Sequence, residues 1–178
     1  MEMVANEKSK FISIMTWQET INFVKQIPYG RNTNRHDFSL VISENKGTCS
    51  SKHAYLKDYA NKNNIANVQL IIGIYKMSET NTNIGKILTD NNINYIPEAH
   101  CYLKIDQKIV DATSNESNFE KIKSDLLQEI EIEPYQVANF KVKYHQEFIK
   151  NWLTESNTAF SFEKIWEIRE KCIQKLSI

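Results

Sequence analysis

The order of apolar and polar residues predicts short helices alternating with short strands. Six stretches have the residue pattern of helices, and they cover residues 16–26, 48–62, 84–89, 118–129, 144–154 and 162–176. Thr16 and Glu19 stand in capping-box register, which marks the start of the first helix. The run SLVIS at 39–43 fits either a strand or a helical turn.

The strand signals are fewer and lie mainly in the middle of the chain. A continuous apolar run at 67–77 predicts a strand that is buried on both faces. Two further runs, 99–105 and 108–113, are separated by Asp106-Gln107, which predicts a hairpin with a two-residue turn. No linker or repeat interrupts this order, so we expect one α+β domain over residues 1–178.

Composition and charge narrow the classes of function. The chain has 178 residues with 22 basic and 22 acidic side chains, a balance that lacks the positive footprint of a nucleic-acid-binding protein. Its apolar runs are far shorter than the roughly 20 residues that a membrane span needs. The opening residues MEMVANEKSKFIS lack the apolar stretch of a secretory signal. We therefore expect a cytoplasmic protein with no membrane or nucleic-acid partner.

Cys49 is the cysteine whose position suggests chemistry. Three cysteines in a neutral chain do not make a disulfide framework, so each must be explained individually. Cys49 stands where a helix begins, and the amides and dipole of a helix start stabilise a thiolate and lower a thiol pKa from its usual value of about 8.5. A small buried residue is the alternative interpretation. Cys101 and Cys172 fall on apolar faces, and we expect both in the core.

A histidine and an aspartate lie on the two strands of the predicted hairpin. Strand alternation puts His100 and Tyr102 on the same face. If the turn is even, Asp111 stands opposite Tyr102 and diagonal to His100, where a carboxylate can accept the imidazole N–H. A slip of one residue would send Asp111 to the other face.

At these residues the chain resembles the transglutaminase-like superfamily of papain-type thiol enzymes. The segment GTCSSKHA, residues 47–54, is similar to the family's Gly-x-Cys start of the nucleophile helix. The segment AHCYLKIDQKIVDAT, residues 99–113, is similar to its histidine strand, hairpin and Asp-(Ala or Pro)-Thr strand. The likeness covers about 45–115, although serines and a lysine replace the aromatic residue that many members place beside the cysteine.

The resemblance implies both a fold and a mechanism. The fold would be a papain/transglutaminase-like core, with the nucleophile helix packed on a small antiparallel sheet and a helical extension at about 141–178. Cys49 would attack an amide or ester carbonyl, His100 would carry the proton, and Asp111 would orient His100. The backbone N–H of Cys49 is one natural donor to the oxyanion.

The sequence also offers candidates for a second oxyanion donor and for residues that line the groove. Related enzymes use an upstream side-chain amide or indole as a second oxyanion donor, and the candidates here are Asn32, Asn34 and Asn45. Each of these three asparagines is as easily interpreted as a turn residue. Tyr102 matches an aromatic residue that the family often carries, and Tyr102 and His53 are candidates for lining the groove.

The expected function is a cysteine-dependent amide hydrolase or acyl transferase without a cofactor. Its substrate would be a peptide, a protein or a small amide. The alternative is a non-catalytic transglutaminase-like binding module whose triad is unused. A zinc site built on Cys49 and His53 with His100 or Asp111 is the third interpretation, but a second closely spaced ligand pair is lacking, so no metal is expected.

The remaining histidines and the lysines fit structural roles. We expect His36 to be exposed in a turn-rich stretch and His145 to pack among aromatic residues. We expect the scattered lysines to lie on solvated helix faces.

Overall fold

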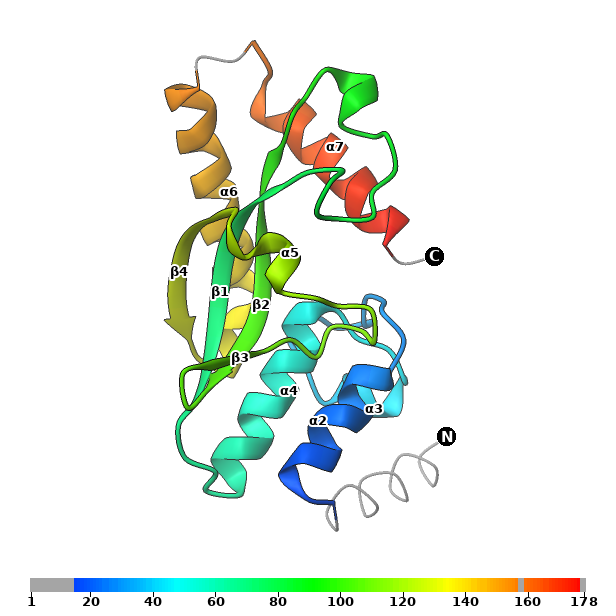
Figure 1. Cartoon of the computed structure of the whole chain (residues 1–178), viewed down its shortest axis with the longest axis vertical. Coiled ribbons are helices and arrows are strands. Elements are labelled where there is room, and N and C mark those ends of the chain that lie inside the picture. Colours follow the sequence, from blue (N-terminus) through cyan, green and yellow to red (C-terminus); the bar gives the residue numbers. More distant parts are fainter. Residues whose placement is uncertain (1–14, 157–158, 177–178) are drawn as a thin grey trace. The chain divides into compact units, whose positions relative to one another are not determined.

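The computed structural model describes residues 15–156 and 159–176 and has an α+β fold (Figure 1). Within these residues there are six α-helices and one four-stranded antiparallel sheet. The helices are α2 (Trp17–Gln26), α3 (Leu40–Ser43), α4 (Cys49–Lys62), α5 (Glu120–Lys123), α6 (Asn139–Glu155) and α7 (Phe162–Lys175), with 3-10 helices η1 (Thr89–Asn91) and η2 (Pro134–Val137). The strands are β1 (Val68–Met77), β2 (Ile96–Ile105), β3 (Lys108–Val110) and β4 (Leu126–Ile132).

The sheet has the strand order β3-β2-β1-β4, so β1 and β2 are its inner strands. An inner strand has a neighbour on each side and needs apolar side chains on both faces when both are covered. Nearly every residue of β1 is buried, which confirms the burial predicted from its apolar run. β2 is buried over most of its length as well.

The β2–β3 hairpin has the register on which the predicted histidine–aspartate geometry depends. Ile105 pairs with Lys108, so the turn has the two residues that the sequence predicted. Both turn residues have positive φ, 47° and 67°, as a type I′ turn requires. The pairing confirms an even turn and extends to Leu103 with Val110, the pair directly before Tyr102 and Asp111.

The chain forms two compact units. The first contains residues 15–72 together with 101–117 and 130–138. In this unit α4 packs against α2, α3 and η2. The helices α2, α3 and α4 are seen side by side in Figure 1. Leu56 and Ala60 of α4 are fully buried, and Trp17 of α2 stacks on Tyr59 with ring centroids 6.0 Å apart.

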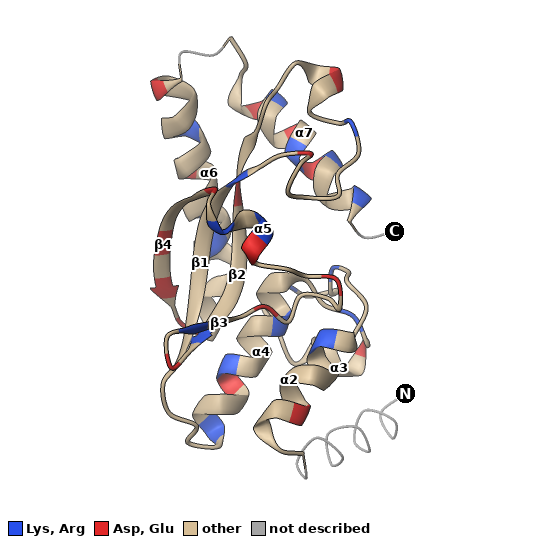
Figure 2. Ribbon diagram, viewed as in Figure 1, with Lys and Arg blue, Asp and Glu red and all other residues tan. Residues whose placement is uncertain are grey.

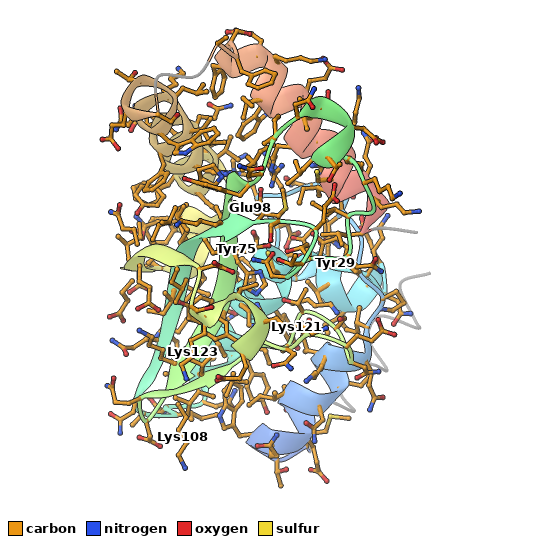
Figure 3. The ribbon with its side chains drawn as sticks, turned by 45° about the horizontal axis from the view of Figure 1, so that its top comes forward. Tyr29, Tyr75, Glu98, Lys108, Lys121 and Lys123 are labelled. Atoms are coloured by element: carbon orange, nitrogen blue, oxygen red, sulfur yellow. The ribbon has the colours of Figure 1, made fainter. Side chains whose placement is uncertain are left out.

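The second unit contains 73–100, 118–129 and the residues from 139 onward. Here α6 packs against α7, along which acidic and basic residues are interspersed (Figure 2). Glu98 of β2, labelled in Figure 3, is buried and accepts two hydrogen bonds from Arg169 of α7. His145 is buried near Trp166, as its aromatic surroundings predicted, but it also lies 3.8 Å from the Glu98 carboxylate.

Some predicted elements differ from the observed ones. The helix predicted at 118–129 is wrong beyond Lys123, because the chain continues as β4 beside β1 instead. The helix predicted at 84–89 is a series of turns that leads into η1. The SLVIS run contains the helical turn α3, and α6 begins five residues earlier than predicted. Of the helices in the described ranges, none is long and apolar enough to cross a membrane.

Candidate functional site

Cys49 is the first residue of α4, as the sequence predicted. Thr48 caps the helix, donating its backbone N–H to Ser51 Oγ at 3.0 Å and accepting the Ser51 N–H through its own hydroxyl at 3.4 Å. An α-helix does not use the amides of its first turn in its own hydrogen-bond ladder, and these amides attract negative charge. Cys49 is 8% exposed and therefore sits at a helix start that is largely shielded from water.

His53 joins the start of α4 to the segment that follows β3. The backbone N–H of Ala112 donates to His53 Nε2 at 2.7 Å, so this nitrogen must carry a lone pair. The proton then sits on Nδ1, which donates to the carbonyl oxygen of Cys49 at 2.7 Å. His53 is therefore a neutral, fully buried ring with both nitrogens in hydrogen bonds. It packs inside the first unit and does not reach the surface.

Asp111 lies in the same part of the first unit. Its Oδ1 accepts the backbone N–H of Thr113 at 3.0 Å and lies 3.8 Å from His53 Nε2. The latter approach is not a hydrogen bond, because Nε2 already accepts the Ala112 proton. The Asp111 side chain is 8% exposed, so its carboxylate is held in a protected position close to the start of α4.

Lys52 is a member of this group that the sequence interpretation missed. It was expected on a solvated helix face, but it is fully buried, and that expectation is wrong. Its ammonium donates to the carbonyl oxygens of Ile27 and, at 2.7 Å, of Thr113. Burial lowers the pKa of Lys52 to about 8, while the charges of Asp111 and Cys49 raise it. The missed signal was its spacing: Lys52 extends by one helical turn the buried row made by Leu56 and Ala60.

The other two cysteines differ from Cys49 in their surroundings. Cys101 and Cys172 are completely buried, which confirms the prediction that they belong to the core. Cys101 Sγ lies 3.8 Å from the hydroxyl of Ser50, which in turn lies 3.9 Å from Cys49 Sγ. Burial raises the pKa of the Cys172 thiol to about 11, so this cysteine stays a protonated, packed side chain at neutral pH.

The three asparagines occupy turns in the first unit. Asn32 uses its Nδ2 to donate to the Glu44 carboxylate at 3.0 Å and to the Lys46 carbonyl at 2.8 Å, which engages both hydrogens of the amide. Asn34 accepts the backbone N–H of His36, an exposed histidine as predicted. Asn45 has a positive φ of 50°, as turn residues of this type often do. In these positions Asn32 has no amide hydrogen left for an oxyanion.

His100 and Tyr102 lie on β2, two residues apart on one face of the strand. His100 belongs to the second unit, where its half-buried ring meets the edge of Tyr75 at 6.4 Å between centroids. Tyr102 belongs to the first unit and is completely buried. The structure thus brings Cys49, His53 and Asp111 together in the first unit and adds Lys52 to them.

A zinc site finds little support in this arrangement. Over residues 15–156 and 159–176, no three His, Cys, Asp or Glu side chains are grouped so that they could hold a metal ion. His53 would also have to give up the hydrogen bond from Ala112 before its Nε2 could bind a metal.

Comparison with known proteins adds no family assignment. The chain matches no protein-family model, no curated protein sequence and no solved structure.

Proposed function

We propose that this protein is a cysteine-dependent amide hydrolase or acyl transferase of the transglutaminase-like type, with a papain/transglutaminase-like core. Cys49 is the nucleophile, His100 is the general base and acid, and Asp111 orients His100. The observation that carries this proposal is the placement of Cys49 as the first residue of a capped helix that also contacts the Asp111 segment. Thiolates are favoured in that position, and a thiolate is the form of cysteine that attacks a carbonyl.

The reaction would run in two halves. His100 takes the thiol proton, and the sulfur of Cys49 attacks the carbonyl carbon to give a tetrahedral oxyanion. The oxyanion collapses, the C–N bond breaks, and His100 returns the proton to the departing amine. A thioester on Cys49 remains. Water or an amine then attacks the thioester, His100 takes the proton from the attacking group, and Cys49 leaves as thiolate.

The backbone N–H of Cys49 is the oxyanion donor that this mechanism uses. A helix does not need the N–H of its first residue for its own ladder, and a donor fixed by the backbone costs no reorganisation during the reaction. The Thr48 cap holds this amide in place through its hydrogen bonds with Ser51. Asn32 is a weaker candidate, because both of its amide hydrogens are engaged by Glu44 and Lys46.

Site-resolved alkylation tests the nucleophile. Iodoacetamide at neutral pH, followed by peptide mass spectrometry, should modify Cys49 faster than the fully buried Cys101 and Cys172. The rate at Cys49 should fall in a His100→Ala variant and stay unchanged in His36→Ala, which removes an exposed histidine. Equal, slow rates at all three thiols would contradict an activated Cys49.

Trapping of the intermediate tests the chemistry. A p-nitrophenyl ester should release nitrophenol and leave one acyl group on Cys49, detected by the mass of the Cys49 peptide. Cys49→Ala should abolish both signals, while Cys101→Ala should keep them.

A binding module is the alternative, and the low exposure of Cys49, 8%, is the observation in its favour. In that case neither an acyl-enzyme nor faster alkylation would be found.

A further inference from the structure

Lys52 is a buried cation whose hydrogen bonds go to backbone carbonyl groups and not to a carboxylate. Its ammonium donates to two backbone carbonyl oxygens, those of Ile27 and Thr113. Moving a charge from water into the interior is costly unless dipoles or opposite charges compensate it. The charge of the Asp111 carboxylate adds to the compensation that the two carbonyl groups provide.

The packing around Lys52 is specific for its long side chain. Gly47 lies so close that a Cβ atom at this position would come within 2.9 Å of Lys52 Cγ and 3.0 Å of Val41 Cγ2. A glycine directly before the cap residue Thr48 thus leaves room for the lysine stem to pass. The stem covers apolar surface while the ammonium reaches the two carbonyl groups at its end.

The Lys52 ammonium and the Asp111 carboxylate both form hydrogen bonds with Thr113. Thr113 accepts from Lys52 Nζ through its carbonyl oxygen at 2.7 Å and donates its N–H to Asp111 Oδ1 at 3.0 Å. Lys52 also lies three residues after Cys49, so both side chains project from one side of the helix. The cation is therefore linked through Thr113 to the candidate aspartate, and it shares one side of α4 with the candidate nucleophile.

We propose that Lys52 is a positioning residue of the proposed active site, where its buried ammonium stabilises the Cys49 thiolate and fixes the Asp111–Thr113 segment against the start of α4. The role given to Cys49 rests on the proposed function. The stabilisation of its thiolate does not, because it follows from charge and burial alone.

The titratable groups that act on this cation come from α4 and from the segment after β3. Cys49 belongs to α4, which also carries the neutral His53, and Asp111 follows β3. The charges of Asp111 and Cys49 both favour the protonated form of Lys52. Electrostatic coupling between two sites is mutual, so the ammonium favours the thiolate by the same amount.

Variants at Lys52 separate charge from shape. Lys52→Met keeps the length of the side chain without its charge, Lys52→Gln keeps donors without charge, and Lys52→Arg keeps the charge. Alkylation of Cys49 by iodoacetamide is followed by peptide mass spectrometry across a pH series. We expect the rate at about pH 6 to fall about tenfold in Lys52→Met and Lys52→Gln, because one nearby charge moves a pKa by about one unit or more. Above the thiol pKa the rates should converge, and Lys52→Arg should resemble the unchanged protein.

A measurement on the unsubstituted protein avoids any effect of the variants on folding. NMR of lysine labelled at the ε-carbon follows the Lys52 titration before and after Cys49 is carbamidomethylated. Loss of the thiolate charge should move the Lys52 midpoint to lower pH. An unmoved Lys52 midpoint, or folded Lys52→Met with an unchanged Cys49 profile, would overturn the inference.

The outcomes also distinguish this inference from the proposed function. A Cys49 that responds to Lys52 but forms no acyl-enzyme supports the inference and contradicts the function. If an acyl-enzyme forms on Cys49 but Lys52→Met leaves the pH profile of Cys49 alkylation unchanged, the proposed function is supported and the inference about Lys52 is contradicted.

Discussion

Ala112 donates its backbone N–H to His53 Nε2 at 2.7 Å, and this contact fixes the residue that directly follows the candidate aspartate. The same imidazole donates through Nδ1 to the carbonyl of Cys49. A single buried ring therefore holds the start of α4 next to the segment around Asp111 by two hydrogen bonds, and we expect its role to be structural.

Replacement of His53 by alanine should lower the free energy of unfolding by about 2–3 kcal/mol. The variant loses packing and leaves the Ala112 N–H buried without its acceptor, which is the costly part of deleting a buried hydrogen bond. Urea denaturation measures the change. His36→Ala removes an exposed histidine and should shift stability by less than about 0.5 kcal/mol. Equal effects of the two substitutions would contradict the bridging role.

Replacement of Glu98 by glutamine should cost about 3–5 kcal/mol, because it leaves Arg169 largely buried beside a neutral partner. The two hydrogen bonds that join these side chains are 2.7 and 2.6 Å long. Denaturant unfolding gives the value. Glu167→Gln on the exposed side of α7 is the matched control and should cost no more than about 1 kcal/mol. A Glu98 variant as stable as this control would show that the buried pair contributes no net stability.

Acid should destabilise the protein through His145. Burial lowers the pKa of His145, the Glu98 charge opposes this, and Arg169 adds to it. The unfolded chain binds this proton near pH 6.5 and the folded chain only at lower pH, so the free energy of unfolding falls as the pH drops below about 6.5. His145→Gln should flatten this slope in a pH series of urea titrations, whereas His36→Gln should leave it intact. An unchanged slope in His145→Gln would assign the acid sensitivity to other groups.

Gly47→Ala should destabilise the first unit by about 1–3 kcal/mol, since the added methyl would meet Lys52 Cγ at 2.9 Å and Ser51 Oγ at 3.1 Å. Gly30→Ala is a matched control, because its Cβ would have only ordinary contacts of 3.6 Å with Lys46. Thermal unfolding of both variants makes the comparison. A neutral Gly47→Ala would mean that the lysine stem can shift at no cost.

Gln107→Gly should stabilise the protein by about 1 kcal/mol. Gln107 has φ 67°, a left-handed conformation that costs a residue with a Cβ roughly 1 kcal/mol and costs glycine little. Lys108→Gly, one residue further on β3, should instead be destabilising. Calorimetric midpoints provide the measurement, and a destabilised Gln107→Gly would mean that the glutamine side chain supports the turn.

Local signals in the sequence predicted the elements well where one short motif decides them. The Thr16–Glu19 capping box starts α2, and the Gly47-Thr48-Cys49 segment starts α4. The two-residue turn predicted the register of the hairpin, in which Ile105 pairs with Lys108 and Leu103 with Val110. In each case the interacting residues lie within a few positions of one another, so one short segment of sequence shows both partners of the interaction.

Other features depend on partners that the sequence does not identify. The helix predicted at 118–129 includes the first four residues of β4. Their leucines and glutamate favour helices, but pairing at the sheet edge outweighs that weak preference. Lysines scattered among acidic residues on helix faces indicate solvated surfaces, but Lys52 has acceptors at Ile27 and Thr113 that lie far away along the chain. Glu98 and Arg169 are separated by 71 positions and carry no shared local pattern.

That separation has a consequence for synthesis. A ribosome adds roughly 5–20 residues per second, so several seconds pass between the translation of Glu98 and that of Arg169. During this interval the Glu98 carboxylate lacks the Arg169 guanidinium. Burial of that part of β2 would then place a carboxylate in the interior without this partner, which is costly. The contacts of α2 and α3 with α4 join residues that lie before position 63, so these contacts can form early. Lys52 of α4 must wait for Thr113, and we expect the Glu98 end of β2 to stay hydrated until α7 has been made.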